Sequence, residues 1–106
     1  MARVLAIVPD LMLASRVEES LRTAGHDVSI VASVPDPVGA DVLVCDLDAV
    51  DLDEAAQANV PTLGFYSHVD VETKQRAEAA GFDLAIPRSR MARELPQLVD
   101  QVLSAP

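Results

Sequence analysis

The sequence predicts one α/β domain whose core is a five-stranded, all-parallel β-sheet with helices on both faces. Three observations predict this class. Short apolar segments alternate with segments of helical periodicity, most of the apolar segments lack the polar alternation of half-exposed strands, and no repeat or linker divides the chain. Because 106 residues is about the length of one domain, we assign residues 1–106 to a single domain.

Composition and charge limit the class of protein. The chain is 50% hydrophobic but only 3% aromatic, so its core must consist mainly of Ala, Val, Leu and Ile. A formal net charge of −9 repels nucleic-acid phosphates and anionic lipids, so we expect neither a nucleic-acid nor a membrane partner. No apolar run approaches the ~20 residues of a membrane span, and Asp10 interrupts the stretch that a signal peptide would need. We therefore expect a cytoplasmic protein.

The first strand and helix have the clearest patterns. Residues 3–8, RVLAIV, form a continuous apolar run that is typical of a strand buried on both faces. Leu13 and Val17 begin a series of apolar residues at helical spacing through residues 11–24. Gly25 follows, where glycine commonly ends a helix.

The order of the other strands follows from their patterns. We expect these strands at residues 27–31, 41–45, 62–66 and 83–87. The second strand alternates apolar and polar residues, and the fifth ends in a proline that cannot donate to a ladder, so both belong at or near sheet edges. This predicts the order 2-1-3-4-5, with the helices after strands one and five on one face and the others on the opposite face.

The helices after the second and third strands are predicted to be short or missing. Residues 32–40 contain Pro35 and Pro37, which prevent a regular helix. The D-x-x-E signal at residues 51–54 predicts a helix of about two turns, through residue 58.

Two longer helices complete the expected pattern. The S-x-x-D signal at residues 67–70 predicts the start of a helix that runs to Ala80 and is ended by Gly81. The last helix occupies residues 91–103, and we expect Pro96 to separate a short turn from the regular helix.

Because the helices after the second and third strands are expected to be short or missing, part of one sheet face is expected to lack a helix over it. One interpretation is an apolar groove that serves as a contact site. The other is that loop side chains such as Val34 and Val38 fold over this face.

Three segments resemble the receiver domains of response regulators, the CheY-like family with a flavodoxin-like fold. Residues 1–28 resemble the family's first strand and helix, residues 40–48 the strand that ends in the phosphoacceptor aspartate, and residues 80–88 the family's AGADDYITK segment. The resemblance covers most of the chain except residues 32–40 and 49–58. It implies a three-layer, doubly wound fold and a role in signal transduction.

The resemblance also implies a phosphorylation pocket at the carboxyl ends of the strands. Asp46 occupies the position of the phosphoacceptor, and Arg88 stands where the family has a lysine. The family's hydroxyl position aligns with Tyr66, and Ser67 follows it. An arginine is a planar fork that can bind an oxyanion, not a compact point charge.

The acidic pair that holds magnesium in receivers is missing. It aligns with Val8 and Pro9, which leaves Asp10 as the neighbouring carboxylate. Asp10 and Asp46 are therefore only weak candidate ligands, and we expect no metal site and no cofactor. The aromatic residue that relays phosphorylation in the family aligns with Ala85, so no such relay is expected.

Other reactive residues have simpler interpretations. Cys45 excludes an internal disulfide, because it is the single cysteine, and we expect a small buried hydrophobic residue. The alternative is a thiol nucleophile paired with His68, which we reject because Asp46 and Asp48 raise the thiol pKa. The acidic residues between positions 46 and 54 lack the spacing of a calcium loop and predict a solvated surface.

These observations favour a pseudo-receiver that signals through protein–protein contacts without phosphoryl transfer and is not an enzyme. Its expected partners are other proteins, including a second copy in a homodimer. One alternative is an atypical receiver phosphorylated on Asp46. A weaker alternative is a small ligand-binding protein or enzyme that uses the crevice at the strand ends, because one fold hosts many activities.

Overall fold

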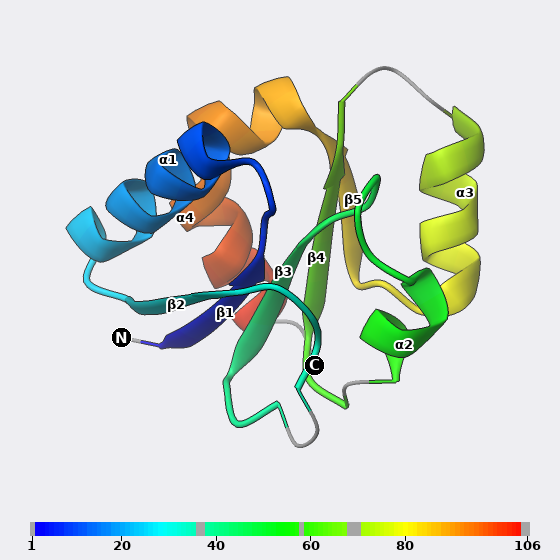
Figure 1. Cartoon of the computed structure of the whole chain (residues 1–106), viewed down its shortest axis with the longest axis horizontal. Coiled ribbons are helices and arrows are strands. Elements are labelled where there is room, and N and C mark those ends of the chain that lie inside the picture. Colours follow the sequence, from blue (N-terminus) through cyan, green and yellow to red (C-terminus); the bar gives the residue numbers. More distant parts are fainter. Residues whose placement is uncertain (1, 36–37, 58, 68–70, 105–106) are drawn as a thin grey trace.

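The computed structural model has a central sheet between two layers of helices (Figure 1). It describes residues 2–35, 38–57, 59–67 and 71–104. Among these residues, no helix is long and apolar enough to cross a lipid bilayer.

The sheet has the predicted order, β2-β1-β3-β4-β5, and all four strand pairs are parallel. The strands are β1 Arg3–Ile7, β2 Asp27–Val31, β3 Val42–Asp46, β4 Thr62–Tyr66 and β5 Leu84–Pro87. One boundary matters for the site. β3 extends through Asp46, which pairs with Phe65 of β4, so this aspartate belongs to the sheet.

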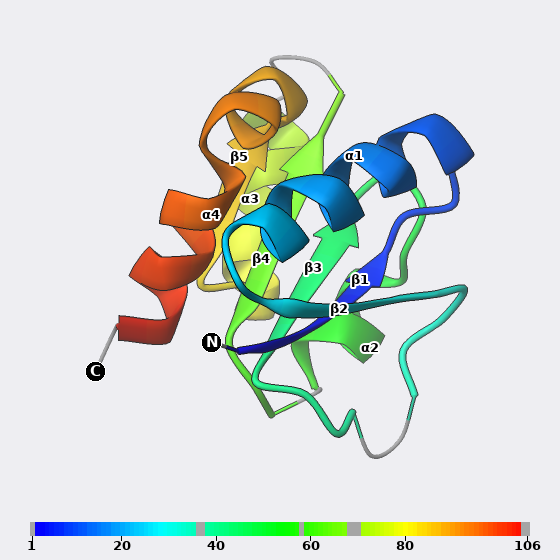
Figure 2. The same cartoon turned by 90° about the vertical axis from the view of Figure 1, so that its left-hand side faces the viewer.

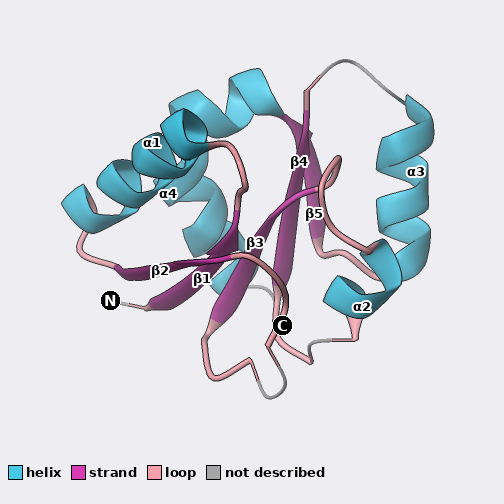
Figure 3. Cartoon of the chain, viewed as in Figure 1, coloured by secondary structure: helices cyan, strands magenta, loops and turns pink. Residues whose placement is uncertain are grey.

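The helices divide between the two faces as predicted (Figures 2 and 3). They are α1 Leu11–Thr23, α2 Leu52–Ala56, α3 Val71–Ala80 and α4 Arg88–Ser104. The α1 and α4 helices pack on one face through fully buried residues such as Leu21 and Val99. On the other face, α2 and α3 pack through Ala55 and Ala77.

Both short connections are confirmed. Among the described residues between β2 and β3 there is no helix, and α2 has five residues. The Asp51 carboxylate caps α2 by accepting a hydrogen bond of 3.0 Å from the Glu54 N–H. Val34 and Val38 are partly buried against the core on this face, so loop side chains contribute to its cover.

The glycine ends of the helices are confirmed. Gly25 and Gly81 follow α1 and α3 with φ of +94° and +107°, a region that favours glycine. The predicted start of the third helix involves residues 68–70, which lie outside the described residues.

The predicted break at Pro96 is wrong. α4 starts directly after β5 and runs continuously through Pro96 to Ser104. Proline lacks an N–H, so residue 96 cannot donate the usual helical hydrogen bond to the Ala92 carbonyl. Figure 1 shows the helix axis turning between its first, orange turns and its last, red turns. Burial of Leu95 and Leu98 on either side of the proline holds both parts against the sheet.

Candidate functional site

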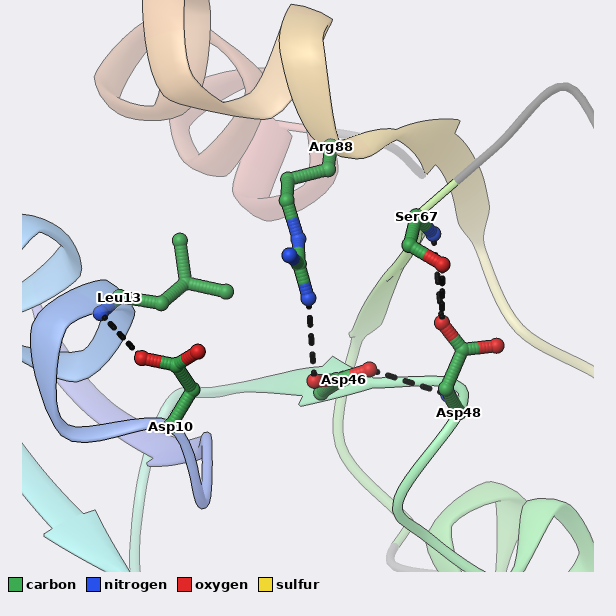
Figure 4. A network of polar contacts seen from close by, with 6 residues as sticks. All are labelled: Asp10, Leu13, Asp46, Asp48, Ser67 and Arg88. Atoms are coloured by element: carbon green, nitrogen blue, oxygen red, sulfur yellow. Dashed lines mark hydrogen bonds and ion pairs between the residues drawn. The ribbon is translucent and has the colours of Figure 1, made fainter.

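The candidate site lies where the carboxyl end of β3 meets the first residue of α4 (Figure 4). Asp46 ends β3 and is only 6% exposed. One of its carboxylate oxygens, Oδ1, accepts a hydrogen bond of 3.0 Å from the Asp48 N–H. The other, Oδ2, lies 3.7 Å from Arg88 Nη2. The fold thereby brings together two of the predicted pocket residues, Asp46 and Arg88.

The alternation of side chains along β3 explains why Asp46 faces Arg88. Val42 and Val44 point into the core beneath α1 and α4, whereas Leu43 and Cys45 point toward α2 and α3. Asp46 is two residues beyond Val44, so its side chain leaves the sheet on the same side as α4.

Arg88 reaches this carboxylate from the start of α4. Its side chain is 38% exposed, and its Nε is buried without a hydrogen-bond partner among the described residues. One nitrogen of the guanidinium, Nη2, therefore forms the ion pair with Asp46, while a second nitrogen, Nε, has no acceptor among the described residues.

The electrostatic environment does not favour the ionised form of Asp46. Burial is the largest effect and raises the pKa of its carboxyl group, and the charges of Asp48 and Asp10 raise it further. The hydrogen bond from the Asp48 backbone and the Arg88 charge lower the pKa but do not reverse the shift. Asp46 is thus a buried carboxylate that a single cation only partly compensates.

Asp10 lies near Asp46 but has a structural role. It is the N-cap of α1, and its Oδ1 accepts a hydrogen bond of 3.1 Å from the Leu13 N–H. Figure 4 shows Asp10 on the loop before α1, with its hydrogen bond directed at the helix. The carboxylate therefore provides an acceptor for a backbone N–H that has no partner within the first turn of the helix.

The donor set does not fit the magnesium ion that receivers bind. Val8, at the first position of the missing acidic pair, is buried in the core, and Pro9 offers no side-chain oxygen. Within the described part of the chain, no three His, Cys, Asp or Glu side chains form a group that could hold a metal. Magnesium prefers an octahedral set of oxygens, which these residues do not supply.

The two residues predicted to supply a hydroxyl to the pocket, Tyr66 and Ser67, contact other groups. Tyr66 packs into the core on the side of α2 and α3, opposite the face on which Asp46 emerges. Ser67 donates hydrogen bonds from its Oγ and its N–H to Asp48 Oδ2, at 2.9 and 3.2 Å. Asp48 therefore joins the loop after β3 to the end of β4.

The sequence patterns did not predict this role of Asp48. The available signal was position: Asp48 and Ser67 both follow the ends of strands that we expected to be neighbours, where parallel strands bring their carboxyl ends together.

Cys45 is an inert residue of the core. Burial raises the pKa of its thiol to about 12, and the charge of Asp46 acts in the same direction. Its rejected partner, His68, lies outside the described residues.

The comparisons with known proteins bear on the fold. No family model and no curated protein matches the chain. A protein described as a response regulator from Chloroflexus aurantiacus has a similar structure, with a TM-score of 0.84, 22% identity and 98% of each chain covered. A receiver domain from Francisella has a TM-score of 0.82 and 17% identity, with 97% of each chain covered.

A third structure agrees with these two. A CheY-like receiver domain from Methanospirillum hungatei has a TM-score of 0.83 and 17% identity, over 97% of this chain and 94% of that one. Together with the parallel sheet of order β2-β1-β3-β4-β5, these likenesses confirm the predicted resemblance at the level of the fold. The chain has the fold of response-regulator receiver domains, the CheY-like type of the flavodoxin-like fold.

Proposed function

We propose that this chain is a pseudo-receiver, a signalling module that acts through contacts with other proteins and with a second copy of itself, without phosphoryl transfer. The observation that carries the proposal is the pair of residues that follow β1: Val8, which is buried, and Pro9 offer no side-chain ligand oxygen and stand where a receiver has the acidic pair that holds magnesium.

Phosphorylation of a carboxylate requires two anions to approach each other. A bound cation normally offsets their repulsion, and here no group of carboxylates is available to hold one. The charges of Asp48 and Asp10 add to the repulsion at Asp46. In addition, both carboxylate oxygens of Asp46 already have a partner, the Asp48 N–H at 3.0 Å and Arg88 Nη2 at 3.7 Å, and each of these contacts competes with an approaching phosphorus atom. These features support a module that presents its surface without chemical activation.

A second candidate function is an atypical receiver phosphorylated on Asp46, and one observation favours it. The buried Arg88 Nε has no hydrogen-bond partner among the described residues, and a phosphoryl oxygen is an acceptor that it could bind.

Intact-mass spectrometry separates the two candidates. The chain is incubated with acetyl phosphate and magnesium chloride, and its mass is recorded promptly because acyl phosphates hydrolyse. We expect no gain of a phosphoryl group. Asp48→Asn is a matched control, because it removes a neighbouring carboxylate of similar position. A mass gain that survives in Asp48→Asn and disappears in Asp46→Asn would overturn the pseudo-receiver and establish the atypical receiver.

A further inference from the structure

A groove runs between α1 and α4 on the outer surface of their layer, where the two helices lie side by side (Figure 2). Its volume is about 530 Å³. Buried apolar residues line it, namely Leu13, Val17, Met91 and Leu95. Arg16 and Arg93 are exposed in its lining, and neither forms an ion pair with any residue that the structure describes.

One stripe of α1 borders the groove along its length. Met12, Arg16, Glu19 and Thr23 follow each other at spacings of four, three and four residues, which places them on one face of the helix. Met12 is 74% exposed although it is apolar, and the other three line the groove. An exposed apolar residue beside an apolar groove is typical of a contact surface.

Charge indicates what contacts this surface. α1 and α4 carry five of the eight basic residues but only four of the seventeen acidic ones, so their combined net charge is +1. The net charge of the whole chain is −9, so the residues outside these two helices have a net charge of −10. The opposite layer, α2 and α3, carries four acidic and two basic residues, a net charge of −2. Of the two helical layers, that of α1 and α4 is therefore the one without an excess of negative charge that would repel a second copy of this acidic protein.

The order of charges along the stripe is self-complementary. When two α1 helices lie antiparallel about a two-fold axis that passes between residues 17 and 18, Arg16 of each copy faces the partner's Glu19. Met12 then faces the partner's Thr23, at the end of the groove lined also by Ala24. An isologous contact of this kind satisfies both copies with the same residues.

We propose that the face formed by α1 and α4 binds the same face of a second copy, with the α1 helices antiparallel, Arg16 paired with the partner's Glu19 and Met12 seated on the partner's groove. This inference rests on the homodimer of the proposed function and names its surface. The acidic layer of α2 and α3 remains free for other proteins.

Sedimentation velocity over a range of protein concentrations, at low and at physiological salt, tests the inference. We expect a monomer–dimer equilibrium that weakens as salt rises. Arg16→Glu and Glu19→Arg each weaken the dimer, and the double variant restores it because the two charges exchange places. Met12→Glu raises the dissociation constant roughly tenfold or more, since it puts a charge in place of an apolar contact.

Matched variants on α3 provide the controls. Arg76→Glu changes the net charge as Arg16→Glu does, and Val71→Glu replaces another exposed apolar residue in the first turn of a helix. Neither should alter the dimer, and circular dichroism verifies that every variant is folded. A monomer at all concentrations, an open-ended assembly, or a dimer insensitive to the α1 variants would overturn this interface. None of these outcomes touches the phosphorylation test, so the two proposals fail separately.

Discussion

Gly64 offers a sharp test of how the site is built, because it lies in the middle of β4 beneath the side chain of Leu47. A methyl group added at Gly64 would lie 2.7 Å from Leu47 Cγ and 3.0 Å from Cδ1, and it would overlap Cδ2. Leu47 is buried and stands between Asp46 and Asp48. We expect Gly64→Ala to lower the free energy of unfolding by about 1–3 kcal/mol, the usual cost of overpacking a core.

The assay is urea unfolding together with a thermal melt. In a chain of this size each kcal/mol corresponds to a change in Tm of about 4–8 °C. Leu47→Ala alone should cost about 2–5 kcal/mol, because it leaves a cavity. Combining it with Gly64→Ala should cost less than the sum of the two, since the new methyl group then occupies part of that cavity. Unchanged stability in Gly64→Ala, or strict additivity in the double variant, would refute the crowding of Leu47 against β4.

Three further predictions concern single buried groups. Burial raises the pKa of Asp46 in the folded protein above its value in the unfolded chain, so the protein loses stability as pH rises from the unfolded pKa through the folded pKa. Asp46→Asn removes this loss, so in a series of thermal melts it should raise Tm most at pH 7 and less toward pH 4. Asp83→Ala should cost about 1–3 kcal/mol in urea unfolding, because the buried Thr62 N–H loses the carboxylate that it contacts at 2.8 Å. Cys45 should resist a thiol reagent at pH 8 and react once urea unfolds the chain, so rapid labelling of the native protein would contradict its burial.

The sheet could be predicted because its signals are local. Continuous apolar runs indicated the inner strands, and the proline that ends residues 83–87 indicated an edge. Pro96 shows where local rules fail. Its missing N–H predicts a break, but buried side chains on both sides of it hold α4 as one helix, and their packing outweighs the lost hydrogen bond.

The site was only partly predictable, for reasons of geometry. The resemblance placed Asp46 and Arg88 at one pocket, but their contact depends on which face of β3 the aspartate leaves. A strand that is apolar on both faces gives no alternation from which that face can be read. The contact of Asp48 with Ser67 joins two loops 19 residues apart, and its formation depends on the parallel register of β3 and β4.

The ion pair between Asp46 and Arg88 has a consequence beyond the pocket. An ion pair with one buried and one partly exposed partner contributes little net stability, because desolvation and solvent screening offset the attraction, so we expect its main effect to be on position. Here it fixes the first residue of α4 against the end of β3. Three residues later, Met91 of the same helix lines the groove between α1 and α4. The pocket and the proposed dimer surface therefore share the first turn of α4, so the ion pair at Arg88 also helps to place a residue of the proposed dimer surface.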